Sequence, residues 1–186
     1  MKKFHINPSC AFWIIGILAI FKKNALFYLL PITFHETSHI IAIVLLKKKI
    51  SKFSLSCTGL NIDIRGSLSY NEQIIISLAG PLGSILFYFL LAPFYENFAN
   101  VSLALGLLNL LPISSLDGSG ILYPLIANQI SFDVSEKIRR IIDIAGTVLF
   151  FTLAVFALVI TRYNFSVLFM AIYIFALTFL RKENLF

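Results

Sequence analysis

Charged side chains are scarce in this chain of 186 residues: Asp, Glu, Lys and Arg make up 13% of it, whereas hydrophobic residues make up 59%. Soluble domains are about 45–50% apolar and about 25% charged. No long polar block separates the apolar segments, so the sequence leaves no room for a separate soluble domain. We therefore expect one domain over residues 1–186, with most of its surface facing lipid or other helices.

Cysteines are almost absent, and the two that occur, Cys10 and Cys57, lie far apart without a CxxC pair. This spacing argues against a disulfide framework and against zinc ligation by thiolates. The net charge of +6 is of the kind found in nucleic-acid-binding proteins. Lysines beside apolar spans record membrane orientation instead, so we expect no nucleic-acid partner.

Apolar stretches dominate the sequence and predict an all-α polytopic membrane protein with about six transmembrane helices. A bilayer core of about 30 Å requires about 20 helical residues. The fourth stretch is interrupted by Pro112, Gly118 and Gly120. The expected spans are residues 9–21, 25–46, 74–95, 101–127, 141–161 and 164–180.

Basic residues are distributed unevenly between the connections of these spans. If the N-terminus is cytoplasmic, only Lys22, Lys23 and Arg162 of the 15 Lys and Arg residues lie on the outer side. The positive-inside rule therefore predicts that both termini are cytoplasmic. The second and fourth spans then run in the same direction, from outside to inside.

Residues 50–69 differ from the apolar spans in their pattern. Ile62, Asp63, Ile64 and Arg65 alternate apolar and polar side chains, and glycines punctuate the segment. Alternation of this kind predicts a short strand or hairpin at the cytoplasmic face of the membrane. A plain connecting loop is the alternative.

The sequence His35-Glu36-Thr37-Ser38-His39 lies inside the second span. Histidines at positions i and i+4 project from one face of a helix and can bind one zinc ion. Glu36 can act as the general base of a metallopeptidase. Ionisable residues within a membrane span are costly and usually functional, which disfavours two packing histidines beside a buried glutamate.

A catalytic zinc site needs a third protein ligand, and Asp117 is the best candidate. At about 1.5 Å per residue, its depth in the fourth span agrees with that of His35 and His39 within about one helical turn. Asp143 is expected near the membrane surface at the start of the fifth span, where a carboxylate suits the helix dipole. The other acids fall in predicted extramembrane segments: Asp63, Glu72, Glu96, Asp133 and Glu136.

At these motifs the sequence resembles the site-2 protease, or M50, family of intramembrane zinc metalloproteases. The matching elements are His35-Glu36-x-x-His39, Ala79-Gly80-Pro81-Leu82-Gly83, and Asn109-Leu110-Leu111-Pro112 leading to Leu116-Asp117-Gly118. In that family the aspartate of the last element is the third zinc ligand. The resemblance therefore implies one Zn²⁺ per chain, held by His35, His39 and Asp117.

Within the family, the chain looks most like the stage IV sporulation protein FB group. It shares the His5-Ile6-Asn7-Pro8 start, six spans and a short 50–69 segment in place of a PDZ domain. The resemblance implies cleavage of a membrane-tethered pro-sigma factor in a bacterial inner, mother-cell or forespore membrane. The expected surroundings are the lipid bilayer. The resemblance leaves open whether inhibitory membrane proteins bind the chain and whether it forms a homo-oligomer. Because the chain stops at Phe186, we expect no CBS domain.

Two departures from the family pattern affect substrate positioning. Ser119 follows Asp117-Gly118 where a second glycine is usual, and Ser84 or a neighbour stands where many relatives carry asparagine. Asn109 and Pro112 are candidate substrate-binding residues. A simple helix-packing role is the alternative for Asn109. Ile62 and Ile64 are further candidates, because a strand there can pair with an extended substrate.

Two other classes of function compete with proteolysis. A metal transporter would use the histidines for permeation, but transporters often have repeated halves, and no repeat is visible. A non-catalytic scaffold derived from a protease would tolerate loss of Glu36, yet the motif is intact. A membrane metalloprotease is the preferred hypothesis.

Overall fold

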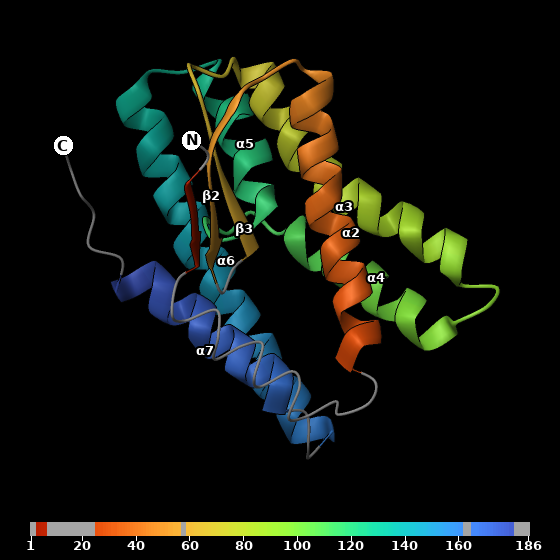
Figure 1. Ribbon diagram of the computed structural model, residues 1–186. Coiled ribbons are helices and arrows are strands. Elements are labelled where there is room, and N and C mark those ends of the chain that lie inside the picture. The colour runs from red at the N-terminus through yellow and green to blue at the C-terminus, as the bar shows by residue number, and fades with distance from the viewer. Residues whose placement is uncertain (1–2, 7–24, 57–58, 162–164, 181–186) are drawn as a thin grey trace. The chain divides into compact units, whose positions relative to one another are not determined.

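The structure is a computed structural model that describes residues 3–6, 25–56, 59–161 and 165–180 (Figure 1). The chain divides into two compact units, Met1–Leu110 and Leu111–Phe186. The predicted span at residues 9–21 and the connection between the last two predicted spans lie outside the described residues.

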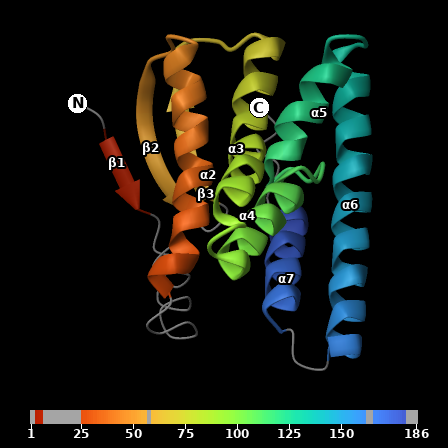
Figure 2. The same ribbon diagram turned by 90° about the vertical axis from the view of Figure 1, so that its right-hand side faces the viewer.

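The described residues of the first unit form three helices and a small sheet. Its elements are β1 (Lys3–Ile6), α2 (Ala25–Leu45), β2 (Ile50–Ser56), β3 (Gly59–Ile64), α3 (Tyr70–Leu91) and α4 (Glu96–Asn109). Helices α2 and α3 run side by side, and α3 also packs against α4 (Figure 2). The second predicted span therefore corresponds closely to α2, whereas α3 begins four residues before the predicted 74.

The hydroxyl side chains of α2 bond to carbonyls of the same helix. The hydroxyl of Thr37 donates to the carbonyl of Thr33 at 2.6 Å, and that of Ser38 donates to the carbonyl of Phe34 at 2.8 Å. Such bonds to the preceding turn let hydroxyls lie in an apolar helix without an unpaired donor. The helix ends where Lys47 adopts a left-handed φ of 56° and the Lys48 N–H reaches the carbonyl of Ile43.

The segment after α2 forms the hairpin that its alternating sequence predicts. Strands β2 and β3 pair antiparallel, and β1 pairs parallel with β2, giving the order β1-β2-β3. Ile62 and Ile64 are half-buried, while Asp63 and Arg65 are exposed, as the alternation requires. Strand β1, which contains His5, was not predicted from the sequence.

The start of α3 is fixed by a capping box and by an ion pair. Ser69 and Glu72 exchange side-chain and backbone hydrogen bonds, which satisfies donors that a helix N-terminus leaves unpaired. The Glu72 carboxylate also lies 2.8 Å from the Lys48 ammonium group. The end of α2 is thereby tied to the beginning of α3.

Small residues let the helices of this unit approach closely. A Cβ at Gly83 would lie 2.0 Å from the hydroxyl of Ser38 on α2, and one at Gly106 would lie 3.0 Å from the carbonyl of Pro81 on α3. The rings of Phe34 and Phe87 stack with centroids 4.4 Å apart. Glycines at the contacts therefore set the distances between α2, α3 and α4.

The second unit contains α5 (Asp117–Ala127), α6 (Phe132–Thr161) and α7 (Phe165–Leu180). Helix α6 packs against α5 and α7, and the hydroxyls of Thr147 and Thr178 lie 3.1 Å apart. The interrupted fourth span is thus two separate helices, α4 and α5, each in a different unit.

Helix α6 begins at Phe132, nine residues before the expected start of the fifth span at 141. Asp133, Glu136 and Lys137 are polar and were assigned to a connection, but they form the first turns of the helix. Asp143 therefore lies inside α6, where it is buried, and not at a helix start.

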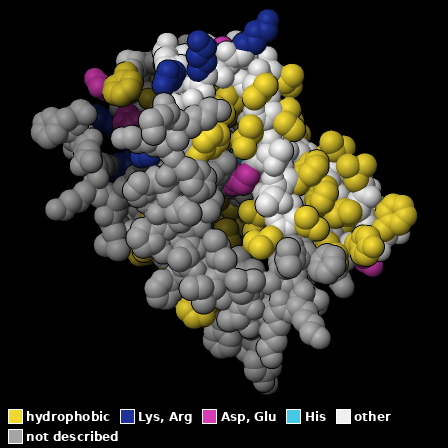
Figure 3. Space-filling model, in the orientation of Figure 1, with side chains coloured by type: hydrophobic (Ala, Val, Ile, Leu, Met, Phe, Trp, Pro, Cys, Tyr) yellow, Lys and Arg dark blue, Asp and Glu magenta, His cyan; other side chains and the backbone are white. Residues whose placement is uncertain are grey.

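Two described helices are long and apolar enough to cross a membrane: Tyr70–Leu91 and the part of α6 from Phe132 to Ile160. Large hydrophobic side chains are exposed on the helices of both units, and in Figure 3 they spread over α2, α3 and α4. An apolar surface of this extent suits lipid. The described helices agree with an all-α fold that carries a small sheet, and six membrane spans stay a prediction.

Candidate metal centre

Two histidines of α2 face α3 where these helices lie in close contact. His35 and His39 are one helical turn apart and are only 4% and 9% exposed. Their Nε2 atoms lie 3.3 Å from each other. Zinc–nitrogen bonds of about 2.0–2.1 Å at a tetrahedral angle place two ligand nitrogens about 3.3–3.4 Å apart. The two imidazoles therefore have the spacing that a shared zinc ion requires.

The opposite ring nitrogens are bound by α3. His39 Nδ1 lies 2.7 Å from the carbonyl oxygen of Ile76, and His35 Nδ1 lies 2.8 Å from the hydroxyl of Ser84. A carbonyl oxygen only accepts, so His39 Nδ1 donates to Ile76, and the neutral ring keeps a lone pair on Nε2. Partners of this kind orient metal-binding histidines and fix their tautomer.

Ser84 differs from the Ile76 carbonyl because a hydroxyl both donates and accepts. When Ser84 donates to His35 Nδ1, the His35 Nε2–H can donate to His39 Nε2 across the 3.3 Å gap. When Ser84 accepts from His35 Nδ1–H, both Nε2 lone pairs are available to a cation. The fully buried hydroxyl is thus compatible with both tautomers of His35.

On α3, Gly80 lies between Ile76 and Ser84, which bind the Nδ1 atoms of the two histidines. A Cβ at this position would lie 2.2 Å from His39 Nε2 and 2.7 Å from His35 Nε2. Ile76, Gly80 and Ser84 are spaced by four residues and therefore share one face of the helix. That face supplies a carbonyl, a hydroxyl and, between them, a glycine that lies against both Nε2 atoms and leaves no room for a side chain. The residues present therefore fit a metal ion held by the imidazoles.

Ser84 was predicted to affect substrate positioning and not to bind a histidine, and the Ile76 carbonyl was not predicted as part of the site. The spacing of Gly80 and Ser84, one helical turn apart, was the available sequence signal. Ser84 is itself held in place, because the hydroxyl of Ser102 on α4 donates to the Ser84 carbonyl at 2.8 Å. Helix α4 thus supports the partner of His35.

Glu36 follows His35 on α2 and is half-buried. Asp117 belongs to the second unit, where it is the first residue of α5 and is also half-buried. A carboxylate in the first turn suits the positive end of the helix dipole. Neither position depends on an unusual backbone: the residue before Asp117 is extended, and α2 is regular around Glu36.

The predicted substrate-binding residues are spread over both units. Ile62 and Ile64 lie on β3, and Asn109 ends α4. The Asn109 amide donates to the carbonyl of Leu105 at 3.0 Å, a bond within its own helix. Pro112 lies in the second unit and lines a small pocket there. Their contacts with substrate stay predictions.

Comparison with known proteins identifies the family. A model of the family described as Peptidase M50B-like matches residues 9–116, more than half of the chain. The chain belongs to this family. M50 metalloproteases are integral membrane proteins that use zinc, and the resemblance inferred from the motifs is confirmed.

Two similar proteins extend the comparison. The M50B chain is 29% identical over 152 residues to stage IV sporulation protein FB of Bacillus subtilis (strain 168). That alignment covers 74% of the chain and 52% of the relative, so the chain spans about half the length of this curated relative. The fold of the chain is also similar to that of a site-2 protease from Methanocaldococcus jannaschii, with a TM-score of 0.65 at 18% sequence identity. This match covers 92% of the chain and 86% of the archaeal protease chain.

We predict that Gly80→Ala abolishes zinc binding, because the new methyl group would collide with the Nε2 atoms of His35 and His39. The zinc content of the purified protein measures this. Gly83→Ala is the matched control, since its methyl group would collide with Ser38 at the same α2–α3 contact. Retention of full zinc by Gly80→Ala, or equal loss in both variants, would contradict the assignment.

We also predict that Ser84→Ala weakens zinc binding by about ten-fold, because His35 loses the partner that orients its ring. Competition with a chelator of known affinity measures the change. Ser102→Ala removes an equally buried hydroxyl that does not touch a histidine. An unchanged affinity in Ser84→Ala, or the larger loss in Ser102→Ala, would show that the hydroxyl does not act on His35.

Proposed function

We propose that the protein is an intramembrane zinc metalloendopeptidase that hydrolyses a peptide bond in or near the membrane segment of a tethered substrate. The observation that carries the proposal is the pair of buried Nε2 atoms, 3.3 Å apart on an apolar helix that also carries Glu36. Imidazoles in such surroundings are costly unless they bind something. Membership of a peptidase family supports the same activity.

The proposed ligands of one zinc ion are His35, His39 and Asp117. Two histidines and a carboxylate are a common donor set of catalytic zinc sites, which keep a further position open. The position of Asp117 in the Leu116-Asp117-Gly118 motif supports its role. A zinc ion in such a site lowers the pKa of a water molecule and polarises a carbonyl group.

Glu36 is the proposed general base and acid. Its carboxylate accepts a proton from the attacking water and later gives that proton to the departing amine, so that water and a peptide become a carboxylic acid and an amine. We propose that the amide of Asn109 and the turn at Pro112 contact the substrate backbone. The amide hydrogen that binds Leu105 holds the Asn109 side chain in a defined orientation.

The proposed substrate is a membrane-tethered protein, and a pro-sigma factor is the specific candidate. The similarity to a sporulation protein supports this choice. A substrate helix must unwind before its carbonyls can be attacked. We propose a multi-pass arrangement with cytoplasmic termini, in which the end of α2 and the sheet lie on the cytoplasmic side, as the basic residues there favour.

The outer edge of β3 is suited to hold an unwound substrate. In the described sheet β3 pairs only with β2, and the Arg65 N–H donates inward to the Lys49 carbonyl at 2.8 Å. Backbone groups alternate in direction along a strand, so Ile62 and Ile64 direct their N–H groups away from β2. An extended segment added at this edge would receive those hydrogen bonds.

We expect Glu36→Gln to retain zinc and to cut cleavage by roughly 10²–10⁴-fold, because the amide cannot accept the proton. The assay is cleavage of a pro-sigma precursor co-reconstituted with the full chain in lipid vesicles. Glu96→Gln makes the same change at an exposed residue and should cleave normally. Cleavage that persists in Glu36→Gln would exclude the mechanism, and zinc flux in that variant would favour transport.

Ile62→Pro should lower kcat/KM for the tethered substrate by about ten-fold, since proline removes an outward N–H while leaving the bonds to β2 in place. Ile62→Ala keeps the N–H and should stay within about three-fold of the original. Both should bind zinc normally, which the same metal analysis checks. Equal effects of the two substitutions would show that the side chain, not strand pairing, matters.

A further inference from the structure

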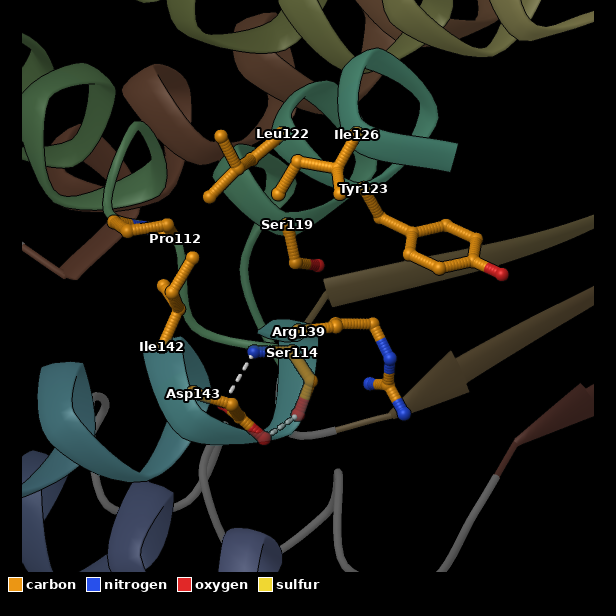
Figure 4. Close-up of a pocket in the computed structure, with 9 residues that line it drawn as sticks. All are labelled: Pro112, Ser114, Ser119, Leu122, Tyr123, Ile126, Arg139, Ile142 and Asp143. Atoms are coloured by element: carbon orange, nitrogen blue, oxygen red, sulfur yellow. Dashed lines mark hydrogen bonds between the residues drawn. The ribbon is translucent and has the colours of Figure 1, made fainter. Parts of the chain in front are cut away.

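A buried carboxylate that the proposed mechanism does not use lies in α6 of the second unit. Asp143 is 8% exposed on a helix whose following turns are apolar. Both of its oxygens accept from one residue: the Ser114 N–H donates to Oδ1 at 2.7 Å, and the Ser114 hydroxyl donates to Oδ2 at 2.7 Å (Figure 4). Such charge-assisted bonds are short and strong.

Ser114 belongs to the connection that leads into α5, three residues before Asp117. Its neighbour Ile113 is fully buried, and a Cβ at Gly146 would lie 3.3 Å from Ile113 Cγ1. Asp143 and Gly146 are three residues apart on α6 and so share a face. Ile113 and Ser114, two consecutive residues of the connection, thereby contact two positions of α6.

The start of α5 has no N-cap hydrogen bond from a side chain. Its N-cap residue is Leu116, which has no side-chain hydrogen bond to offer, whereas Ser, Thr, Asp and Asn are preferred at this position. The attachment of Ser114 to Asp143 comes immediately before this uncapped end. Arg139, one turn earlier on α6, pairs with Glu136 and lies over the ring of Tyr123.

We propose that Asp143 is a positioning residue for Asp117: by binding Ser114 it holds the turn that sets the place of the Asp117 carboxylate. The proposal rests on the proposed role of Asp117 as a zinc ligand. Asp143 is not one of the proposed ligands. It substitutes for the missing N-cap, so that the first residue of α5 is held from α6 in addition to the bond from the Ser119 hydroxyl to the Leu116 carbonyl within the turn.

The test compares Asp143→Ala, Ser114→Ala and their combination, in the full chain in detergent. Chelator competition gives the zinc affinity, and the visible absorption of the Co²⁺-substituted protein reports coordination geometry. We expect affinity to fall about ten-fold in Asp143→Ala and about three-fold in Ser114→Ala, with altered Co²⁺ bands. The combination should be no weaker than Asp143→Ala alone, because both changes break one attachment.

Ser115→Ala is the matched control, since Ser115 is the adjacent serine and its buried hydroxyl has no hydrogen-bond partner among the described residues. It should keep the original affinity and spectrum. If Asp143→Ala does not fold, Ser114→Ala, which keeps the backbone bond to Oδ1, still decides. The proposal is overturned if Ser114→Ala and Asp143→Ala both keep the zinc affinity and the Co²⁺ spectrum of the unsubstituted protein. Asp143 then has a purely structural role, even if the melting temperature of the metal-free protein falls.

Asp117→Asn separates this proposal from the one on which it rests. If Asp117→Asn changes neither zinc affinity nor the Co²⁺ spectrum, the ligand assignment is wrong, and the positioning role of Asp143 falls with it. If Asp117→Asn changes both but the Asp143 and Ser114 variants change neither, only the positioning role is wrong.

Discussion

The close approach of α3 to α2 at Gly80 is the constraint on which the candidate site depends. Only a residue without a side chain leaves space beside the Nε2 atoms of His35 and His39, since a Cβ there would lie 2.2 Å from the nearer one. The same approach brings the Ile76 carbonyl and the Ser84 hydroxyl within 2.8 Å of the Nδ1 atoms. Helix packing and metal-site geometry are therefore one requirement on the sequence of α3.

Burial of the two imidazoles makes hydrogen-bond partners from α3 necessary. Imidazole nitrogens that leave water without partners are unfavourable by several kcal/mol, and a membrane offers no water in exchange. Each Nδ1 is satisfied by a group on α3, and the remaining Nε2 atoms face each other. Nothing in the packing of α2 and α3 needs two histidines for stability, because apolar residues of similar volume would pack there more cheaply. The zinc ion that we propose they bind would account for their presence.

The sequence predicted those features that follow from local periodicity or from a motif. An apolar run of helical length gave α2, alternation gave the half-buried Ile62 and Ile64, and the His-Glu-x-x-His spacing placed both imidazoles on one face. Strand β1 could not be predicted, since its pairing with β2 joins residues far apart in the sequence. The start of α6 was misplaced because its first turns are polar, and a polar segment before a span resembles a connection.

The misplaced helix start had a consequence for Asp143. A carboxylate at a helix N-terminus needs no partner beyond the dipole, whereas one inside a helix and buried must receive hydrogen bonds. Sequence position alone does not distinguish these cases, because the distinction depends on where the helix begins. The contact of Ser84 with His35 was missed for a related reason: a serine on an apolar helix resembles any small packing residue until its neighbour across the contact is known.

The two Nδ1 partners are not equivalent, and the difference bears on how a buried site can exist both with and without its ion. The Ile76 carbonyl accepts only and holds the neutral His39 in one tautomer. Ser84 can reverse its hydrogen bond, so His35 can either donate to His39 across 3.3 Å or present a lone pair to a metal. One fixed and one adaptable partner keep every buried polar atom of the imidazole pair satisfied in both states. Binding of the proposed ion would then require this hydroxyl to rotate and one proton to relocate.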